Sequence, residues 1–330
     1  MGKVSGVYAL GGIALASEIP LPELEKSAEE ADSRRRATIR LGHVPARIEG
    51  AVELDPDCFA TPSQFLLRIP GIGRYLVSGG SEIVVEPEAN APPLDLRAYL
   101  LSAAFIVLCQ QRGLLPLHAS AVSSGGEAVA FLAPSGQGKS SVAAHLARRG
   151  LRVLSDDICL VNADEPPRPM AIPAAPWLKL WRHSLQELGW GADGLERVFS
   201  ADDKYRFPLD DPRRPEPIGK LLFLERGEDG IDNRTHGGSN DGSEDRARTP
   251  EARRHGQVEF RKLTRAQTVP LLMALTHQAY LLQATGQRDR NFLQCSRVAA
   301  SADAWRLIRP WGLAHMEETI DAIEDFVRGR

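Results

Sequence analysis

Residues 131–140 read Phe-Leu-Ala-Pro-Ser-Gly-Gln-Gly-Lys-Ser, an apolar run that breaks into a glycine-containing turn and ends in Gly-Lys-Ser. Residues 128–132 have the composition of a buried parallel strand, and residues 140–149 carry apolar side chains at helical spacing. Gly150 then ends the predicted helix. The order strand, turn, helix aims the free N–H groups of the first helical turn at one point. This stretch therefore predicts a phosphate-binding loop.

The phosphate-loop pattern gives each residue of the turn a role. Gly136 and Gly138 allow the backbone to come close to a phosphate. Lys139 is expected to reach the β- and γ-phosphates, and the Ser140 hydroxyl is expected to be a ligand of Mg²⁺. The pattern normally begins with glycine, whereas Ala133 stands here. The residues predicted to bind the nucleotide are Ser135, Gly136, Gln137, Gly138, Lys139, Ser140 and Ser141.

The overall composition is that of an ordinary globular protein. With 330 residues the chain is long enough for two hydrophobic cores of moderate size. Lysine and arginine number 40 against 43 acidic residues, which gives a formal net charge of −3. This balance provides no basic surface for nucleic acid or for anionic lipids. We therefore expect neither nucleic acid nor a membrane as a partner.

Four cysteines stand singly along the chain, at Cys58, Cys109, Cys159 and Cys295. Their spacing matches neither a metal knuckle nor a disulfide framework, so we expect buried thiols in a reducing compartment. The first residues lack the pattern of a secretory signal, and the most apolar stretch, residues 100–109, is too short to span a bilayer. The predicted location is the cytoplasm.

The chain is predicted to form two domains, residues 1–112 and residues 113–330. Short apolar or alternating runs separated by Pro, Gly and Asp argue for a smaller, β-rich N-terminal domain. Residues 95–111 are apolar around most of the helix circumference and predict a buried helix that joins the domains. Residues 226–257 are rich in Gly, Asp, Arg, Asn and Ser, which predicts a disordered insertion. The N-terminal runs are residues 8–15, 37–41, 65–69, 75–78 and 83–85.

The C-terminal part alternates strand and helix patterns, which predicts an α/β domain around the phosphate loop. Residues 202–208 mix cations with aromatic side chains and are expected to form a loop. The predicted strands are residues 114–122, 128–132, 151–154, 158–161, 221–225, 258–263 and 305–308. The predicted helices are residues 140–149, 183–188, 269–284, 292–299 and 316–327.

Polar residues gather at two places beside the predicted phosphate loop. Because side chains alternate along a strand, residues 114–122 present His118 and Ser120 on one face. Asp156 and Asp157 interrupt an apolar run after the following helix. Burying two adjacent carboxylates is costly unless positive charge lies beside them, and a nucleotide-bound Mg²⁺ would provide that charge. We therefore expect these residues near the bound phosphates.

These segments together resemble the catalytic core of the HPr serine kinase/phosphorylase family, which is related to the phosphoenolpyruvate carboxykinase nucleotide fold. The resemblance rests on residues 118–120 (His-Ala-Ser), on residues 133–140, and on residues 149–157, which begin Arg-Gly and end Ser-Asp-Asp. It is specific over residues 114–161 and looser over the rest of the C-terminal half. It implies an α/β phosphate-loop kinase domain that uses ATP and Mg²⁺.

The resemblance implies a role for each residue of the site. The separations of 21 positions (118 to 139) and 18 positions (139 to 157) are similar to those of the family. Asp157 would be the base that takes the proton from an acceptor hydroxyl, and His118 would lie against the reacting phosphate. Asp156 would help to place the metal or the nucleophile, so that Ser140 and Asp156 are the implied metal ligands. The implied catalytic set is Asp157, His118, Asp156 and Lys139. Taken alone, His118 also fits a structural histidine and Asp156 a turn cap.

The chain departs from the family downstream of this core. The family's Glu-Ile-Arg-Gly-Leu-Gly segment, which supplies a second metal carboxylate, and its Pro-Gly-Arg-Asn loop are absent, and residues 177–181 and 203–208 stand in those regions. Their absence argues against reverse phosphorolysis and against HPr as the substrate. The N-terminal half, with residues 8–22 and 110–118, is more similar to the HPr-kinase-like proteins of lasso peptide biosynthesis. Those kinases are understood to phosphorylate the C-terminal serine of a precursor peptide.

The residues and the resemblance together predict an ATP- and Mg²⁺-dependent serine kinase whose partner is a peptide or small protein, preferably a lasso precursor. Lys179, Lys204 and Arg206 are candidate contacts for phosphate or substrate. Two alternatives stay open: an HPr-type kinase/phosphorylase acting on a phosphotransfer protein, and a nucleotide-gated peptide-binding ATPase. A small-molecule acceptor is also compatible with the sequence. The sequence carries no signature of an oligomer interface and leaves the oligomeric state open.

Overall fold

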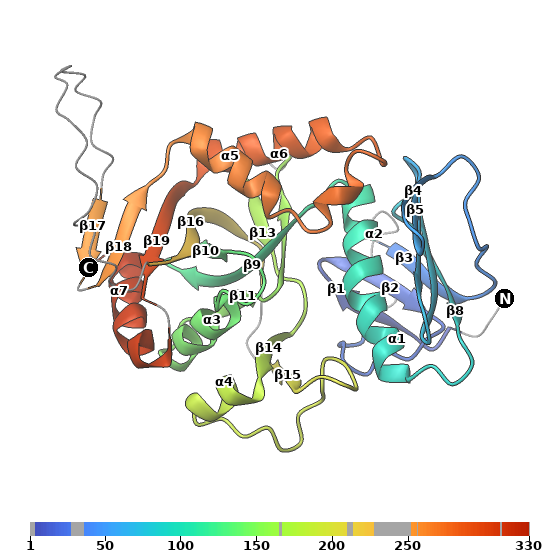
Figure 1. The fold of residues 1–330 in the computed structure, drawn as a ribbon, viewed down its shortest axis with the longest axis horizontal. Helices are drawn as coiled ribbons and strands as arrows, with labels where there is room; N and C mark the ends of the chain where they lie inside the picture. The colour runs from blue at the N-terminus through green and yellow to red at the C-terminus, as the bar shows by residue number, and fades with distance from the viewer. Residues whose placement is uncertain are drawn as a thin grey trace, which may run out of the picture.

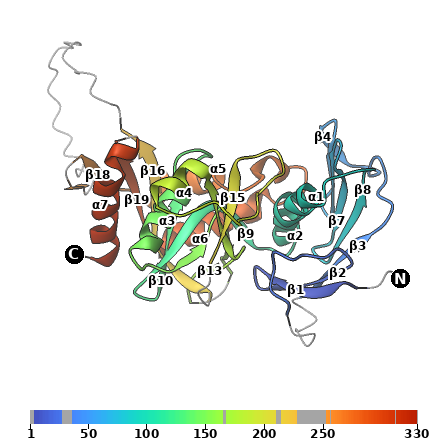
Figure 2. The ribbon, with the colours of Figure 1, turned by 90° about the horizontal axis from the view of Figure 1, so that it is seen from below.

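Two large mixed sheets organise the chain, with one long helix standing between them (Figures 1 and 2). They are seen in a computed structural model, in which α-helices, strands and connections form a mixed α/β fold. The structure describes residues 4–27, 36–164, 167–209, 214–227, 252–255, 257–310 and 312–329.

The first sheet has eight strands in the order β1-β2-β3-β8-β7-β6-β5-β4. The β2–β3 and β3–β8 pairs are parallel and the others are antiparallel. All five predicted N-terminal runs fall on strands of this sheet, whereas β4 and β5 were not predicted because they are very short. The strands are β1 (Gly6–Leu10), β2 (Ile13–Ser17), β3 (Arg36–Leu41), β4 (Val52–Asp55), β5 (Cys58–Ala60), β6 (Gln64–Ile69), β7 (Gly73–Ser78) and β8 (Glu82–Pro87).

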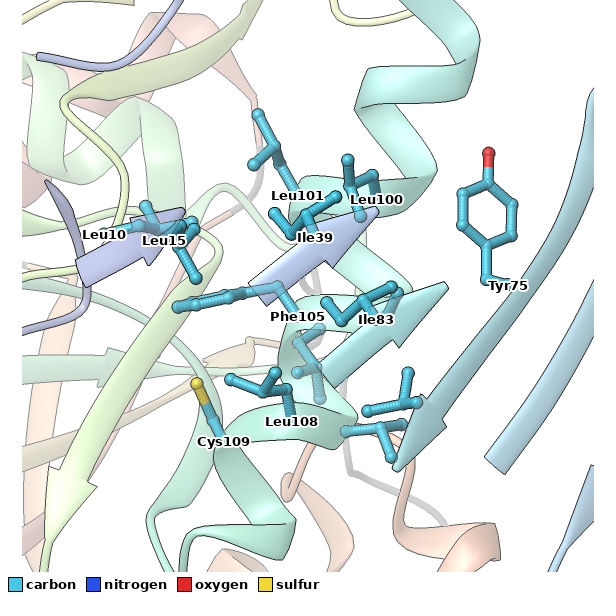
Figure 3. Close-up of a cluster of buried hydrophobic side chains, with 14 of the residues drawn as sticks. Leu10, Leu15, Ile39, Tyr75, Ile83, Leu100, Leu101, Phe105, Leu108 and Cys109 are labelled. Carbon is cyan, nitrogen blue, oxygen red and sulfur yellow. The ribbon is translucent and has the colours of Figure 1, made fainter. Parts of the chain in front are cut away.

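The predicted buried helix is confirmed as a continuous helical segment with a wider turn in its middle. It consists of α1 (Pro93–Tyr99), the π-helical turn η2 (Leu100–Ala104) and α2 (Phe105–Gln111). Its apolar side chains pack against those of the first sheet (Figure 3). By length and composition this helix could cross a membrane, but most of it is buried inside the protein, as expected of a core helix.

The second sheet has nine strands, and part of it closes on itself. The strand order is β10-β9-β12-β13-β16-β19-β18-β17, β11 pairs with β9, and β10 also pairs with β16 in parallel. The strands are β9 (Leu115–Ser124), β10 (Glu127–Leu132), β11 (Val153–Ser155), β12 (Ile158–Asn162), β13 (Met170–Ile172), β16 (Glu216–Arg226), β17 (Ala252–His255), β18 (Val258–Lys262) and β19 (Asp303–Arg309).

Helices cover the second sheet on both faces (Figure 1). Side chains alternate along β10, so Val129 and Phe131 join the core under α3 (Lys139–Arg148) and α7 (Met316–Arg328). Ala130 and Leu132 join the core under α5 (Arg265–Ala274) and α6 (Arg288–Ser301) on the opposite face. The result is a three-layer α/β/α arrangement, which accounts for the near-continuous apolar run of the predicted parallel strand.

A short hairpin lies beside the second sheet. It pairs β14 (Trp177–Trp181) with β15 (Lys204–Pro208), and α4 (Arg182–Glu187) follows β14. The prediction of a loop at residues 202–208 was therefore wrong. Tyr205 and Phe207 alternate with polar residues. Tyr205 is buried because one face of the hairpin packs on the hydrophobic core that also contains residues of α3 and α7.

The predicted helix at residues 269–284 was wrong in extent. The helix α5 ends at Ala274, Thr276 bridges to Leu117 of β9, and a short helical turn, η3 (Ala279–Leu281), follows. The apolar residues after the break are used by another core, because Leu281 packs with the long helix and the first sheet. A second short turn, η4 (Leu313–His315), precedes α7. Most of the predicted insertion, residues 226–257, lies outside the described residues.

One hydrophobic cluster connects the two sheets. The cluster around the long helix contains residues of the first sheet and also Ile158, Leu160, Trp177 and Leu281 from the second part of the chain. The four cysteines are unpaired and buried, as predicted. The division of the chain near residue 112 remains a prediction.

Candidate active site

The predicted phosphate loop connects β10 to α3 in the order strand, turn, helix. Gly136 and Gly138 both have positive φ angles, +81° and +79°, and Gly138 is the N-cap of the helix. The Nζ atom of Lys139 donates to the carbonyl oxygens of Ala133 and Pro134, at 2.8 and 3.0 Å. Burial lowers the pKa of Lys139 to about 8. The lysine therefore lies folded back along its own loop, within reach of a ligand that could compete for its ammonium group.

Arg309, which the sequence did not single out, closes the other side of the loop. It ends β19, is only 3% exposed, and donates from Nη2 to the carbonyl oxygen of Gln137 at 3.0 Å. A Cβ atom on Gly138 would lie 2.7 Å from the same Nη2 atom. The backbone angle therefore favours glycine at position 138, and a larger residue would also have to displace the Arg309 guanidinium.

Asp156 and Asp157 form a tight turn between two short strands, β11 and β12, that both pair with β9. The N–H of Ile158 donates to the carbonyl oxygen of Asp156 at 2.8 Å, and Asp157 has a φ angle of +66°. A left-handed conformation costs a non-glycine residue roughly 1–2 kcal/mol, somewhat less for Asp. Strain of this kind persists where the surrounding structure holds it, and it concentrates at functional sites.

The Asp156 carboxylate is buried and fully engaged with its neighbours. Its Oδ1 atom accepts from the Ser120 hydroxyl at 2.6 Å, and its Oδ2 atom accepts from the backbone N–H of Lys179 at 2.7 Å. The residue is 2% exposed and does not line the cavity described below. These contacts hold β14 against the turn, which is a positioning role. The role of Asp156 as a metal ligand remains a prediction.

The Asp157 carboxylate, in contrast, points into the cavity. Its Oδ2 atom lies 2.6 Å from Nζ of Lys179, and its Oδ1 atom lies 3.6 Å from Nε2 of His118. Burial opposes ionisation of this carboxyl, but the charge and hydrogen bond of Lys179, together with the neighbouring His277 and His118, outweigh burial and hold the pKa of Asp157 far below its usual range. Asp157 is therefore an ionised carboxylate with one bound cation.

Two histidines stack beside this carboxylate. The rings of His118 and His277 have centroids 4.7 Å apart, and Nε2 of His277 lies 2.7 Å from the carbonyl oxygen of Asp157. Because a carbonyl oxygen only accepts, Nε2 of His277 carries the proton. Burial, together with the charge of Lys139, lowers the pKa of His118 to about 4, and burial lowers the pKa of His277 as well. Both rings are neutral at pH 7.

A cavity of about 400 Å³ connects these groups. Among the described lining residues, four side chains are cationic, from Lys139, Lys179, Lys204 and Arg309, and one is a carboxylate, from Asp157. In a chain with a net charge of −3, such a cluster marks a binding site for a polyanion. The remaining lining residues include His118, Ser135, Gly136, Gly138, Ser140, Ser141, Leu180, Trp181, His183, Ser184, Gly312 and Met316.

The structure separates the other predicted site residues into two groups. The predicted nucleotide-binding residues line the cavity except for Gln137, whose carbonyl oxygen is held by Arg309. Of the candidate contacts in the β14–β15 hairpin, Lys179 and Lys204 line the cavity. Arg206, the third candidate, is not among the residues that line the cavity. It is 6% exposed and forms ion pairs with Glu23 at 2.9 Å and Glu196 at 2.7 Å, so its role as a contact for phosphate or substrate remains a prediction without support from this geometry.

The comparisons with known proteins show only a distant structural similarity. No protein-family model and no curated protein match the chain. Among solved structures, the chain is similar to the HPr(Ser) kinase/phosphatase from Coxiella burnetii, with 11% sequence identity and a TM-score of 0.31, over 64% of this chain and 90% of that one. A similarity this distant carries over neither a function nor site residues.

Two groups in the cavity could bind a divalent cation. The Ser140 hydroxyl stands in the first turn of α3, where the phosphate-loop pattern places a Mg²⁺ ligand. His118, Asp157 and His277 each offer a nitrogen or oxygen donor, and the three donors lie within 4.8 Å of one another. Lys179 already neutralises Asp157. The hard oxygen donors that Mg²⁺ prefers are therefore Ser140 and the phosphates of a bound nucleotide.

Proposed function

We propose that this chain is an ATP- and Mg²⁺-dependent kinase that transfers the γ-phosphoryl group to a serine hydroxyl of a peptide. The preferred acceptor is the C-terminal serine of a lasso precursor peptide. The observation that carries the proposal is the cavity itself, in which the glycine loop and four cationic side chains surround one carboxylate, that of Asp157.

The cavity fits a nucleoside triphosphate in charge and size. Lys139, Lys179, Lys204 and Arg309 provide positive charge around the loop, and the free N–H groups at the start of α3 point to the same region. A volume of about 400 Å³ lies within the range of small-molecule sites. The three phosphates of ATP would replace the loop carbonyls as partners of Lys139.

The proposed step is an in-line displacement at the γ-phosphorus atom. The serine oxygen forms a bond to phosphorus, the bond from phosphorus to the β,γ-bridging oxygen breaks, and the hydroxyl proton passes to the carboxylate of Asp157. ADP leaves with the electron pair of the broken bond. When bound, Mg²⁺ would neutralise charge on the phosphates, and Ser140 is the residue that would hold it. Lys139 and Arg309 stabilise the charge on the leaving group.

The ion pair between Asp157 and Lys179 gives the proposed base a dependence on the nucleotide. A carboxylate whose pKa is held far below its usual range is a weak base. A phosphate group near Lys179 would share the charge of that lysine and so raise the pKa of Asp157. The carboxylate would then accept a proton more readily when the nucleotide is in place.

The choice of a peptide acceptor rests on the sequence resemblance of the N-terminal half to lasso peptide kinases. The first sheet and its shared core place that half directly beside the site-bearing sheet (Figure 2). We infer that the first sheet contributes to peptide recognition.

The deciding experiment is intact mass spectrometry of a precursor peptide that ends in serine, after incubation with the protein, Mg²⁺ and ATP. The same peptide with its final serine changed to alanine is the control for the acceptor. Lys139→Ala is the control for the site. One added phosphate on the first peptide alone, lost in Lys139→Ala, supports the proposal. Phosphate on HPr instead supports the HPr-type alternative, and ATP binding without any phosphorylated product supports the peptide-binding ATPase.

A further inference from the structure

One wall of the cavity is apolar, in contrast to the cationic wall around the phosphate loop. It is formed by Leu180 and Trp181 at the end of β14 and by Met316 at the start of α7. Leu180 and Met316 are buried, whereas Trp181 is 45% exposed. The cavity therefore has a charged end and an aromatic end.

Single exposed apolar side chains are common on protein surfaces, so the position of Trp181, and not its exposure alone, decides its role. Of the exposed large hydrophobic residues in the described part of the chain, Trp181 alone lines the cavity. The others are Val4, Leu41, Val52, Tyr280, Phe292 and Leu293. Trp181 is thus the exposed aromatic residue of the described cavity lining, where a ligand could contact it.

The hairpin places the Trp181 ring beside the cations of the cavity, with the ammonium group of Lys204 over one face of the ring. Trp181 lies opposite Lys204 in the β14–β15 pairing, and Nζ of Lys204 lies 5.6 Å from the ring centroid. Lys179, two residues earlier on the same face of β14, reaches Asp157. On this face of β14, Lys179 therefore lies at the reacting end of the cavity and Trp181 lies at its apolar wall.

We propose that Trp181 is the stacking platform for the base of the bound nucleotide. The inference rests on the proposed function and adds a base subsite to it. A nucleoside triphosphate has one polyanionic end and one flat aromatic end, and these match the two ends of the cavity. Stacking on an aromatic side chain accepts every base, and purines offer the larger face. We therefore expect this subsite to bind purine nucleotides most tightly. Stacking on Trp181 does not by itself distinguish ATP from GTP.

Calorimetric titration with Mg²⁺-ATP and with Mg²⁺-tripolyphosphate tests this assignment, because tripolyphosphate has the anionic chain but no base. In Trp181→Ala we expect the affinity for ATP to fall by about 5- to 150-fold, the range for loss of one stacked base. The affinity for tripolyphosphate should stay unchanged, and Trp181→Phe should recover part of the loss for ATP. Phe292→Ala is the matched control, since Phe292 is 49% exposed and does not line the cavity.

The possible failures are distinct. If the unmodified protein binds ATP no more tightly than tripolyphosphate, or if Trp181→Ala weakens both ligands equally, the ring makes no contact with the base and the inference is overturned, while the proposed function stands. If the unmodified protein binds neither ligand, the proposed function itself is overturned.

Discussion

Replacing Lys179 with methionine removes the cation that neutralises Asp157 and keeps a side chain of similar length. The two side chains are joined at 2.6 Å and are 14% and 27% exposed, so the pair is largely withdrawn from water. Breaking a fully buried pair costs about 3–5 kcal/mol, because the remaining charge is left without a partner. With the partial exposure seen here, we expect Lys179→Met to lower the free energy of unfolding by about 2–3 kcal/mol at pH 7.

The loss should depend on pH in a defined direction. In the unmodified protein the pKa of Asp157 lies below its unfolded value, so the stabilisation by the pair is present above about pH 4 and is lost as the pH falls further. In Lys179→Met, burial raises the pKa of the carboxyl above its unfolded value, so that this variant loses stability as the pH rises. The difference between the two proteins should therefore be larger at pH 7 than near pH 4, where the variant no longer carries an unpaired charge, and it should shrink further below pH 4 as the pair in the unmodified protein is protonated.

Urea denaturation followed by tryptophan fluorescence at both pH values measures this difference. The double variant Lys179→Met/Asp157→Asn should regain most of the stability, because it leaves no unpaired charge. Lys204→Met is the control, since no carboxylate partner of Lys204 lies among the described residues. An equal loss at pH 7 and pH 4, or no recovery in the double variant, would refute the reasoning from the ion pair.

Three further predictions follow from the site. Asp157→Asn should retain ATP binding in calorimetry and reduce phosphoryl transfer by about 10²- to 10⁴-fold, the contribution of a general base; undiminished transfer would remove Asp157 from that role. Because the pKa of His118 is lowered to about 4 in the folded protein, this imidazole is protonated in the unfolded chain at a higher pH than in the folded one. The free energy of unfolding should therefore fall by up to about 3 kcal/mol as the pH falls from about 6.5 to about 4. His118→Gln should reduce that slope in urea denaturation and leave the part that comes from His277, and an unchanged slope would contradict it. Gly138→Ala should lower stability by roughly 1–3 kcal/mol and weaken tripolyphosphate binding, because its Cβ would meet Arg309 at 2.7 Å. Gly150→Ala is its control, with φ at +84° and no atom within 4 Å of the added Cβ; equal losses of tripolyphosphate binding in both variants would argue against the clash.

The elements that the sequence predicted correctly are those whose pattern is local. Residues 128–150 show a buried strand, a glycine turn and an amphipathic helix in succession, and β10, the loop and α3 follow that order. The long helix was predicted from the apolar residues around its circumference, and it is buried on most sides. His118 was correctly placed near Asp157, because alternation along one strand fixes which side chains share a face.

The residues that the sequence missed reach the site through contacts between distant segments. His277 contacts Asp157 from 120 positions away, and Arg309 contacts Gln137 from 172 positions away. The helical pattern at residues 269–284 concealed the turn that carries His277, because apolar residues on both sides of the break satisfy the same periodicity. A histidine with a glutamine after it, inside an apolar run, was the only local signal for that break.

The β14–β15 hairpin has neighbours of different kinds along its length. At its middle pair, opposite Lys179, the buried Arg206 is ion-paired with Glu23 and Glu196, and Glu23 belongs to the N-terminal half. At one end, Trp181 and Lys204 line the cavity. Five cross-strand pairs connect the two ends and make the ribbon stiff. A displacement of the N-terminal half would therefore be transmitted through Arg206 and along the ribbon to the residues that line the cavity.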